Sequence, residues 1–228
     1  MTSDLLLVHG AWHNGAGFTR LADELHQRGV QTATVELPSV GPADQDLGDL
    51  YADAAVVRAA AEAMGDHVAV LGHSYGGLVI TQALAGLANV DHLLYLTAFM
   101  LDEGETLFAA CGGVDPPWWV RSSDGTRLTA ATPEAVFYNT CEPEIAREAV
   151  ATLRTQSIQS FLDPVTAVAW RNTPSTYFVC EHDQAIPPFA QEAMSQRAND
   201  VVRLATDHSP FLCQPALLAD EIVRALRT

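Results

Sequence analysis

Short apolar runs that alternate with helix-patterned segments constrain the fold of this chain more than any other feature. The runs expected as strands are residues 4–8, 32–37, 67–71, 92–98, 176–180 and 201–204. Between them, apolar residues recur at helical spacing, as Leu21, Ala22 and Leu25 do ahead of Gly29. Strands that alternate with helices assemble into a mostly parallel sheet with helices on both faces. The sequence therefore predicts an α/β fold built on six strands.

The pattern breaks in one long segment, residues 101–172. This segment shows no clear strand, and Pro, Gly and Trp punctuate short helical stretches such as residues 143–158. We therefore expect a core domain of residues 1–100 and 173–228, and a small helical lid of residues 101–172 inserted after the fourth strand. Because open α/β sheets bind ligands at the carboxyl ends of their strands, this lid should cover the site.

The charge of the chain excludes several classes of partner. All 12 basic residues are arginine and 28 residues are acidic, which gives a net charge of −16. Nucleic acids and anionic membranes are bound through clustered positive charge, which is not expected here. No apolar run approaches the roughly 18 residues of a membrane span, and the first residues show no signal-peptide pattern. We expect a cytoplasmic protein without nucleic-acid or membrane partners.

The four cysteines, Cys111, Cys141, Cys180 and Cys213, lie far apart and form no C-x-x-C pair. Such spacing indicates neither a zinc knuckle nor a disulfide framework. In a cytoplasmic protein, buried free thiols are the expected state of these side chains.

The most specific motif is G-H-S-Y-G-G at residues 72–77, between the third predicted strand and a helix. It fits G-x-S-x-G, in which a sharp turn from strand to helix exposes a serine and the glycines let neighbouring backbones approach closely. Ser74 would be the exposed nucleophile. The backbone N–H of Tyr75, at the start of the helix, would point at the anion formed when Ser74 attacks a carbonyl.

Two further residues could complete a catalytic triad with this serine, which needs a base and a carboxylate that orients the base. The chain order expected on such a sheet is serine, acid, histidine. His208 follows the last predicted strand and Asp183 follows the fifth, so both should meet Ser74 at one edge of the sheet. Asp102, after the fourth strand, is an alternative acid. Asp207 is expected to be a solvated or turn-capping residue.

The loop after the first strand, residues 8–18, should supply a second donor for the anion. The N–H of Ala11 is the expected donor, and that of Trp12 is the next candidate. His9 in this loop and His73 beside the serine are expected to pack or to form hydrogen bonds.

Two other types of site have weaker support. Gly15 and Gly17 precede a helix and Glu36 follows about twenty residues later, as in dinucleotide-binding folds. However, Arg20 stands where the third glycine of G-x-G-x-x-G belongs. The two histidines of the first loop lie on a glycine-containing loop rather than a helix, and the sequence contains no H-E-x-x-H motif. We therefore expect no cofactor and no metal.

Four motifs together resemble those of one enzyme superfamily. They are V-H-G-A-W, G-H-S-Y-G-G, E-H-D-Q-A-I-P-P and D-H-S-P-F-L-C-Q-P, in that order. Over essentially its whole length the chain resembles the α/β-hydrolase superfamily, and within it the compact esterases that include plant methyl esterases, hydroxynitrile lyases and small bacterial carboxylesterases. The residues that the resemblance implies are the nucleophile Ser74, the acid Asp183, the base His208 and the oxyanion donors Ala11 and Tyr75.

The resemblance also separates hydrolysis from cyanohydrin cleavage. Hydroxynitrile lyases of this group place a lysine directly after the catalytic histidine and a threonine directly after the first-loop histidine. Ser209 and Gly10 stand at those positions, and the chain contains no lysine. The resemblance therefore favours an esterase.

We expect a serine hydrolase of the carboxylesterase type that cleaves small-to-medium apolar or aromatic esters through an acyl-enzyme. Its partner would be a small-molecule ester, and a homodimer is left open. Aromatic residues cluster in the expected lid and could form an apolar pocket. The residues expected to contact substrate are Trp12, Phe108, Trp118, Trp119, Phe137 and Tyr138.

Two alternative functions would use the same triad. A pathway-specific lyase or cyclase could act without hydrolysis, and analysis of its products would identify it. A non-catalytic receptor for a small molecule could keep the triad and turn over slowly, so that an ester would give a burst without useful turnover.

Overall fold

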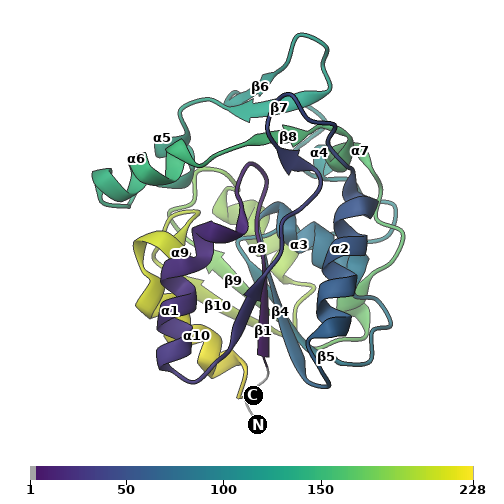
Figure 1. The fold of residues 1–228 in the computed structure, drawn as a ribbon, viewed down its shortest axis with the longest axis vertical. Coiled ribbons are helices and arrows are strands. Elements are labelled where there is room, and N and C mark those ends of the chain that lie inside the picture. The colour runs from purple at the N-terminus through teal and green to yellow at the C-terminus, as the bar shows by residue number, and fades with distance from the viewer. Residues whose placement is uncertain (1–3, 228) are drawn as a thin grey trace.

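The computed structural model describes residues 4–227, and its centre is a sheet of six parallel strands (Figure 1). Their spatial order is β2 (Thr32–Thr34), β1 (Asp4–Val8), β4 (Val68–His73), β5 (Val90–Leu96), β9 (Ser175–Cys180) and β10 (Asp200–Leu204). All neighbouring pairs are parallel, which confirms the predicted sheet. β2 ends at Thr34, three residues earlier than expected, and beyond it the backbone N–H of Leu37 donates to His9 Nε2 (3.2 Å).

Helices cover both faces of this sheet. One face carries α1 (Thr19–Gln27) and α10 (Pro215–Ala225), and the other carries α2 (Leu50–Ala63), α3 (Tyr75–Ala83) and α8 (Pro188–Ser195). Leu5 and Leu7 of β1 pack with the first group of helices, whereas Leu6 and Val8 pack with the second. Because both faces of β1 are buried, its residues 5–8 are all apolar. None of the helices within residues 4–227 is long and apolar enough to cross a membrane.

Residues 101–172, called here the insertion, lie above the sheet in Figure 1 and contain both helices and strands. The expected helical character is present in α4 (Leu107–Ala110), α5 (Pro133–Phe137), α6 (Pro143–Ala151) and α7 (Gln159–Leu162). The expectation of no strand was wrong. The strands β6 (Trp119–Arg121), β7 (Arg127–Ala130) and β8 (Thr155–Ser157) form an antiparallel sheet with β3 (Val40–Gly41).

Short strands explain this error. Strands of two to four residues are too short to show the alternation by which strands are recognised in a sequence. The helical stretch predicted for residues 143–158 also includes residues 155–157, although α6 ends at Ala151. The remaining short elements are η1 (Gly15–Phe18), η2 (Ala169–Arg171) and α9 (Pro210–Cys213).

Two of the four cysteines form a disulfide, so the expectation of free thiols was wrong for Cys141 and Cys213. Their Cα atoms lie 4.8 Å apart, although 72 residues separate them in the sequence. The fold brings the start of α6 against α9, and that proximity cannot be read from spacing along the chain. Cys111 and Cys180 are free.

The helix that follows the G-H-S-Y-G-G turn crosses β1 at backbone contact distance. A Cβ added to Gly76 would lie 2.6 Å from the carbonyl oxygen of Val8 and 2.7 Å from that of His9. A Cβ at Gly72 would lie 2.6 Å from Gly76 O. Glycine is therefore required at both positions, and α3 is held close enough to β1 for the preceding turn to be sharp.

A buried carboxyl group, Asp53 on α2, joins α3 to the insertion. It accepts hydrogen bonds from Ser39 N (2.8 Å), Ser39 Oγ (2.5 Å) and Tyr75 Oη (2.5 Å). Gln156 of β8 donates to Ser39 Oγ (2.9 Å), which connects this network to the antiparallel sheet. Burial raises the pKa of Asp53 to about 6, and the three hydrogen bonds only partly oppose that rise.

Replacing Gly76 with alanine should destabilise the protein, because the added methyl group would overlap Val8 O. Overpacking of this kind costs about 1–3 kcal/mol or more. Gly17→Ala is the matched control, since its added Cβ would have no neighbour closer than 3.8 Å. Equilibrium unfolding in urea should give a clearly lower midpoint for Gly76→Ala alone. Equal midpoints for the two variants would contradict the close crossing.

The Asp53 carboxyl should make the wild type lose stability as pH rises. Its pKa is about 6 in the folded protein, against an ordinary value of 3.8, so the folded state binds the proton more tightly. The resulting stabilisation is complete below about pH 4 and is lost as pH rises through about 6, by up to about 3 kcal/mol. Asp53→Asn has no titrating group at this position.

Urea unfolding of both proteins across this range should show the wild type losing stability relative to Asp53→Asn as pH rises. A difference that stays constant with pH would contradict the raised pKa.

Candidate active site

Ser74 occupies a strained turn between β4 and α3. Its φ of 53° and ψ of −120° lie in a region that residues other than glycine rarely adopt. Ser74 N donates to Leu96 O (3.2 Å), and Ser74 O accepts from Gly77 N and Phe99 N (both 3.1 Å). These bonds hold the turn so that Ser74 lies on the wall of a cavity. The motif had predicted this strand–turn–helix arrangement.

His208 and Asp183 are hydrogen-bonded to each other and buried. His208 lies between β10 and α9, and Asp183 follows β9, so the fold brings together two residues that are 25 positions apart. His208 Nδ1 lies 2.7 Å from Asp183 Oδ2. His208 also lines the cavity that contains Ser74, whereas the described residues show no hydrogen bond between these two side chains. Catalytic hydrogen bonds often tighten only when substrate binds.

The Asp183 carboxylate is held by four donors besides His208. Oδ1 accepts from the backbone N–H groups of Ala185 (2.6 Å) and Ile186 (3.0 Å). Oδ2 accepts from Thr97 Oγ1 and from Gln191 Nε2 (3.2 Å). This set of donors stabilises a buried negative charge and fixes its position beside the imidazole.

A second histidine, His73, holds the backbone of His208. His73 Nε2 donates to His208 O (2.9 Å), which makes the N–H tautomer at Nε2 the one present. Burial, together with the nearby His208, lowers the pKa of His73 well below its usual value. His73 is therefore a neutral hydrogen-bonding residue, as expected. His9 also forms a hydrogen bond, as expected, because its Nδ1 donates to Gly10 O (2.9 Å).

Two backbone N–H groups beside Ser74 are without hydrogen-bond partners among the described residues. They belong to Ala11 and Tyr75, which both line the cavity. The first-loop backbone runs against the nucleophile, because a Cβ on Gly10 would lie 2.9 Å from Ser74 Cβ. The N–H of Trp12, the second candidate donor, is engaged by Gln156 Oε1 (3.4 Å). The geometry favours Ala11 over Trp12 as a donor to a ligand.

The cavity is mostly apolar and narrow, with a volume of about 30 Å³. Four of the aromatic residues expected to contact substrate line it: Trp12, Trp118, Trp119 and Phe137. Phe108 and Tyr138 do not. Phe108 packs partly buried against the core, and the Tyr138 hydroxyl donates to His13 Nε2 (2.9 Å).

Several residues of the cavity wall were missed by the sequence analysis. They are Phe99, Leu107, Cys111, Pro116, Phe161, Ala185 and Ile186. Position could have identified three of them, because Phe99 follows a strand on the same edge and Ala185 and Ile186 follow Asp183. No such position identifies Phe161, because it lies on α7 of the insertion.

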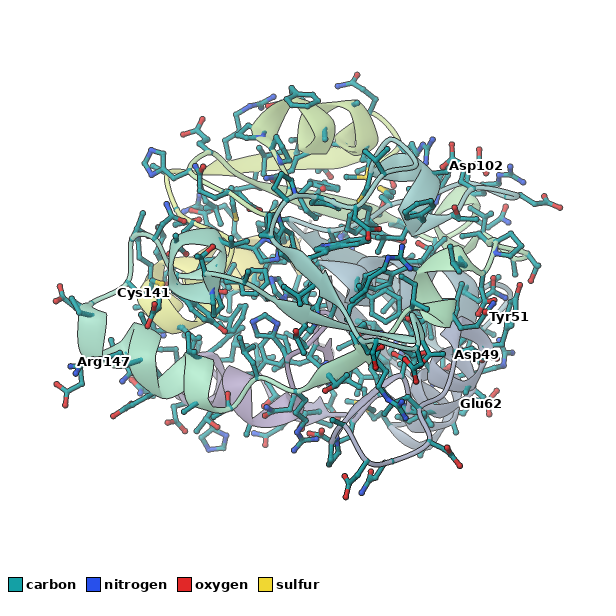
Figure 2. The ribbon with its side chains drawn as sticks, turned by 90° about the horizontal axis from the view of Figure 1, so that it is seen from above. Asp49, Tyr51, Glu62, Asp102, Cys141 and Arg147 are labelled. Carbon is teal, nitrogen blue, oxygen red and sulfur yellow. A yellow bond between two sulfur atoms is a disulfide. The ribbon has the colours of Figure 1, made fainter. Side chains whose placement is uncertain are left out.

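The two other acidic candidates have different roles. Asp102 lies near the periphery of the molecule in Figure 2, where its carboxylate pairs with Arg171. Asp207 caps a turn by accepting from Ser209 N (3.0 Å), as expected, but it is fully buried rather than solvated. Neither carboxylate bonds to the imidazole of His208 within the described structure.

One group of side chains within residues 4–227 has the chemistry of metal ligands, namely Cys141, Asp207 and Cys213. The two sulfur atoms are bonded to each other, so neither is a thiolate. In this form the group does not fit a metal ion.

Comparison with known proteins agrees with this geometry. The model of the alpha/beta hydrolase family matches residues 5–221. The alpha/beta hydrolase nvfD of Aspergillus novofumigatus is 31% identical and aligns over 98% of this chain and 94% of its own. Methylesterase 2 of Arabidopsis thaliana is 24% identical over 96% of this chain and 94% of its own.

A solved structure shows the same fold. The pyrethroid hydrolase from Sphingobium faniae superposes with a TM-score of 0.84 at 23% identity, over 100% of this chain and 98% of its own. The relatives are named esterases and hydrolases, which confirms the predicted enzyme class, a carboxylesterase-type hydrolase. The match to the family model spans nearly the entire chain, and the chain belongs to the alpha/beta hydrolase family.

Proposed function

We propose that this protein is a serine carboxylesterase that hydrolyses small-to-medium esters with an apolar or aromatic part. One observation carries the proposal. His208, which is held by a 2.7 Å hydrogen bond to the buried Asp183, lines the same cavity as Ser74 on its strained turn. A nucleophile, a base and an orienting acid are the three groups that acyl transfer requires.

In the first half of the proposed reaction, Ser74 Oγ attacks the ester carbonyl carbon while His208 Nε2 takes the hydroxyl proton. Asp183 keeps the proton of the neutral ring on Nδ1 and stabilises the imidazolium that forms. The N–H groups of Ala11 and Tyr75 hold the oxyanion, and each such donor typically contributes about 3 kcal/mol. His208 then protonates the leaving alcohol.

In the second half, water replaces the alcohol. His208 takes a proton from this water as its oxygen attacks the acyl-enzyme, and the same two N–H groups hold the second oxyanion. Collapse releases the carboxylic acid and returns the proton to Ser74. No step requires a cofactor.

The insertion acts in this proposal as a lid domain, residues 101–172, over a core of residues 1–100 and 173–228. Trp118, Trp119 and Phe137 line the cavity from the insertion, and Trp12 lines it from the core. The apolar and aromatic lining of the cavity suits the apolar or aromatic part of a substrate. Relatives named methylesterase and carbendazim hydrolyzing esterase support a small-molecule ester as the substrate class.

Ser74→Ala should lower the turnover of p-nitrophenyl butyrate about a thousandfold or more, because loss of one triad member removes acyl-enzyme formation. Ser195→Ala is the matched control. Its serine is also buried, but its hydroxyl bonds to Glu192 O within α8. Release of p-nitrophenol measures both variants, and thermal melts confirm that both are folded. Activity of Ser74→Ala near that of the wild type would refute the serine mechanism.

Trp118→Ala should raise KM for an aromatic ester such as phenyl butyrate about tenfold and change kcat little, because the ring contributes binding contact rather than chemistry. Val120→Ala, an exposed position two residues further along in β6, should leave both constants unchanged. Steady-state kinetics measures the effect. A wild-type preference for long-chain lipid esters, or an unchanged KM in Trp118→Ala, would contradict the assigned substrate class.

A further inference from the structure

Residues 138–141, called here the strap, connect α5 to α6 in the insertion. The first three residues contact loops that carry proposed catalytic groups, and the fourth is bonded to α9, which follows the loop of His208. No strap residue lines the catalytic cavity. An effect of the strap on the reaction must therefore act through the loops that it touches.

The first strap residue holds the oxyanion loop. The Tyr138 hydroxyl donates to His13 Nε2 (2.9 Å), and His13 Nδ1 donates to Ala11 O (2.7 Å). Burial lowers the pKa of His13 to about 3, so its ring stays neutral and Nε2 remains an acceptor. Tyr138 is thereby linked to the residue whose N–H is a proposed oxyanion donor.

The next two strap residues hold the loops of the acid and the base. Asn139 Nδ2 donates to His182 O (3.1 Å), the carbonyl of the peptide that leads into Asp183. Thr140 N donates to Asp207 Oδ2 (2.9 Å). The other oxygen of Asp207 accepts from Ser209 N (3.0 Å), so this buried carboxylate brackets His208 on both sides.

The last strap residue is bonded covalently to α9, the helix that follows the loop of the base. Cys141 forms the disulfide with Cys213, the final residue of α9, which begins two residues after His208. Figure 2 shows Cys141 where the insertion meets the yellow C-terminal segment. The strap is therefore attached to its surroundings by three hydrogen bonds and one covalent bond.

We propose that the strap is a positioning element, which sets the placement of Ala11, Asp183 and His208 relative to one another, and that the Cys141–Cys213 disulfide holds it in place. This inference rests on the proposed esterase function. Small misplacements of reacting groups lower the rate of the chemical step strongly. Because the strap lies outside the cavity, its release should lower kcat and leave KM nearly unchanged.

The Cys141→Ser, Cys213→Ser double variant tests the covalent bond. With p-nitrophenyl butyrate, its kcat should fall about tenfold or more while KM stays within about threefold of the wild-type value. Dithiothreitol should lower the wild type to the same level. In that reaction the dithiol is oxidised to its cyclic disulfide and Cys141 and Cys213 become thiols. The double variant should not respond to dithiothreitol, so it controls for effects at Cys111 and Cys180.

Tyr138→Phe tests the strap without touching the disulfide and applies even if the double variant fails to fold. It removes only the hydroxyl and should lower kcat several-fold at nearly constant KM. Tyr95→Phe is the matched control, because it removes a buried hydroxyl that bonds to Thr81 Oγ1 away from the three loops. Its kcat should equal that of the wild type.

Three outcomes would overturn the disulfide, the role of the strap or the esterase mechanism. Alkylation of the unfolded, unreduced protein should label two cysteines, and labelling of four would overturn the disulfide. Wild-type kcat in both Tyr138→Phe and the reduced protein would overturn the strap, even with Ser74→Ala inactive. Full activity of Ser74→Ala would instead refute the esterase mechanism, which separates the two failures.

Discussion

The crossing of α3 over β1 at Gly76 is the contact on which the proposed active site depends. Only glycine allows backbone atoms to approach as closely as Gly76 and the carbonyl of Val8 do. This approach permits the sharp turn at Ser74 and brings the loop after β1 against the nucleophile. One packing contact therefore places Ser74 beside the same cavity as the N–H groups of Ala11 and Tyr75, which have no hydrogen-bond partner within residues 4–227.

Burial and hydrogen bonding give three neighbouring histidines different roles. The ring centroids of His13 and His73 lie 5.6 Å apart, and those of His73 and His208 lie 4.7 Å apart. Burial lowers the pKa of His13 and of His73, and each donates to a backbone carbonyl. Of the three, His208 alone bonds to a carboxylate, that of Asp183. A base needs that partner to stabilise its imidazolium, so the surroundings favour His208 for the proposed role.

Much of this arrangement could be predicted from the sequence, because local patterns encode it. Apolar runs indicated the parallel strands, and G-x-S-x-G indicated the turn at Ser74. Chain order then suggested Asp183 and His208, which the fold brings into contact. The strands of the insertion had no detectable period, since each has at most four residues. The disulfide and Phe161 depend on tertiary proximity, which no local pattern reports.

Reaction with a fluorophosphonate tests most directly whether Ser74 is a nucleophile activated by His208 and Asp183. Such a reagent phosphonylates an activated serine and releases fluoride, and peptide mass spectrometry locates the adduct. We expect a single adduct on the peptide that contains Ser74, formed much more slowly in His208→Ala. An adduct on another residue, no adduct, or an equal rate in His208→Ala would contradict the proposed triad.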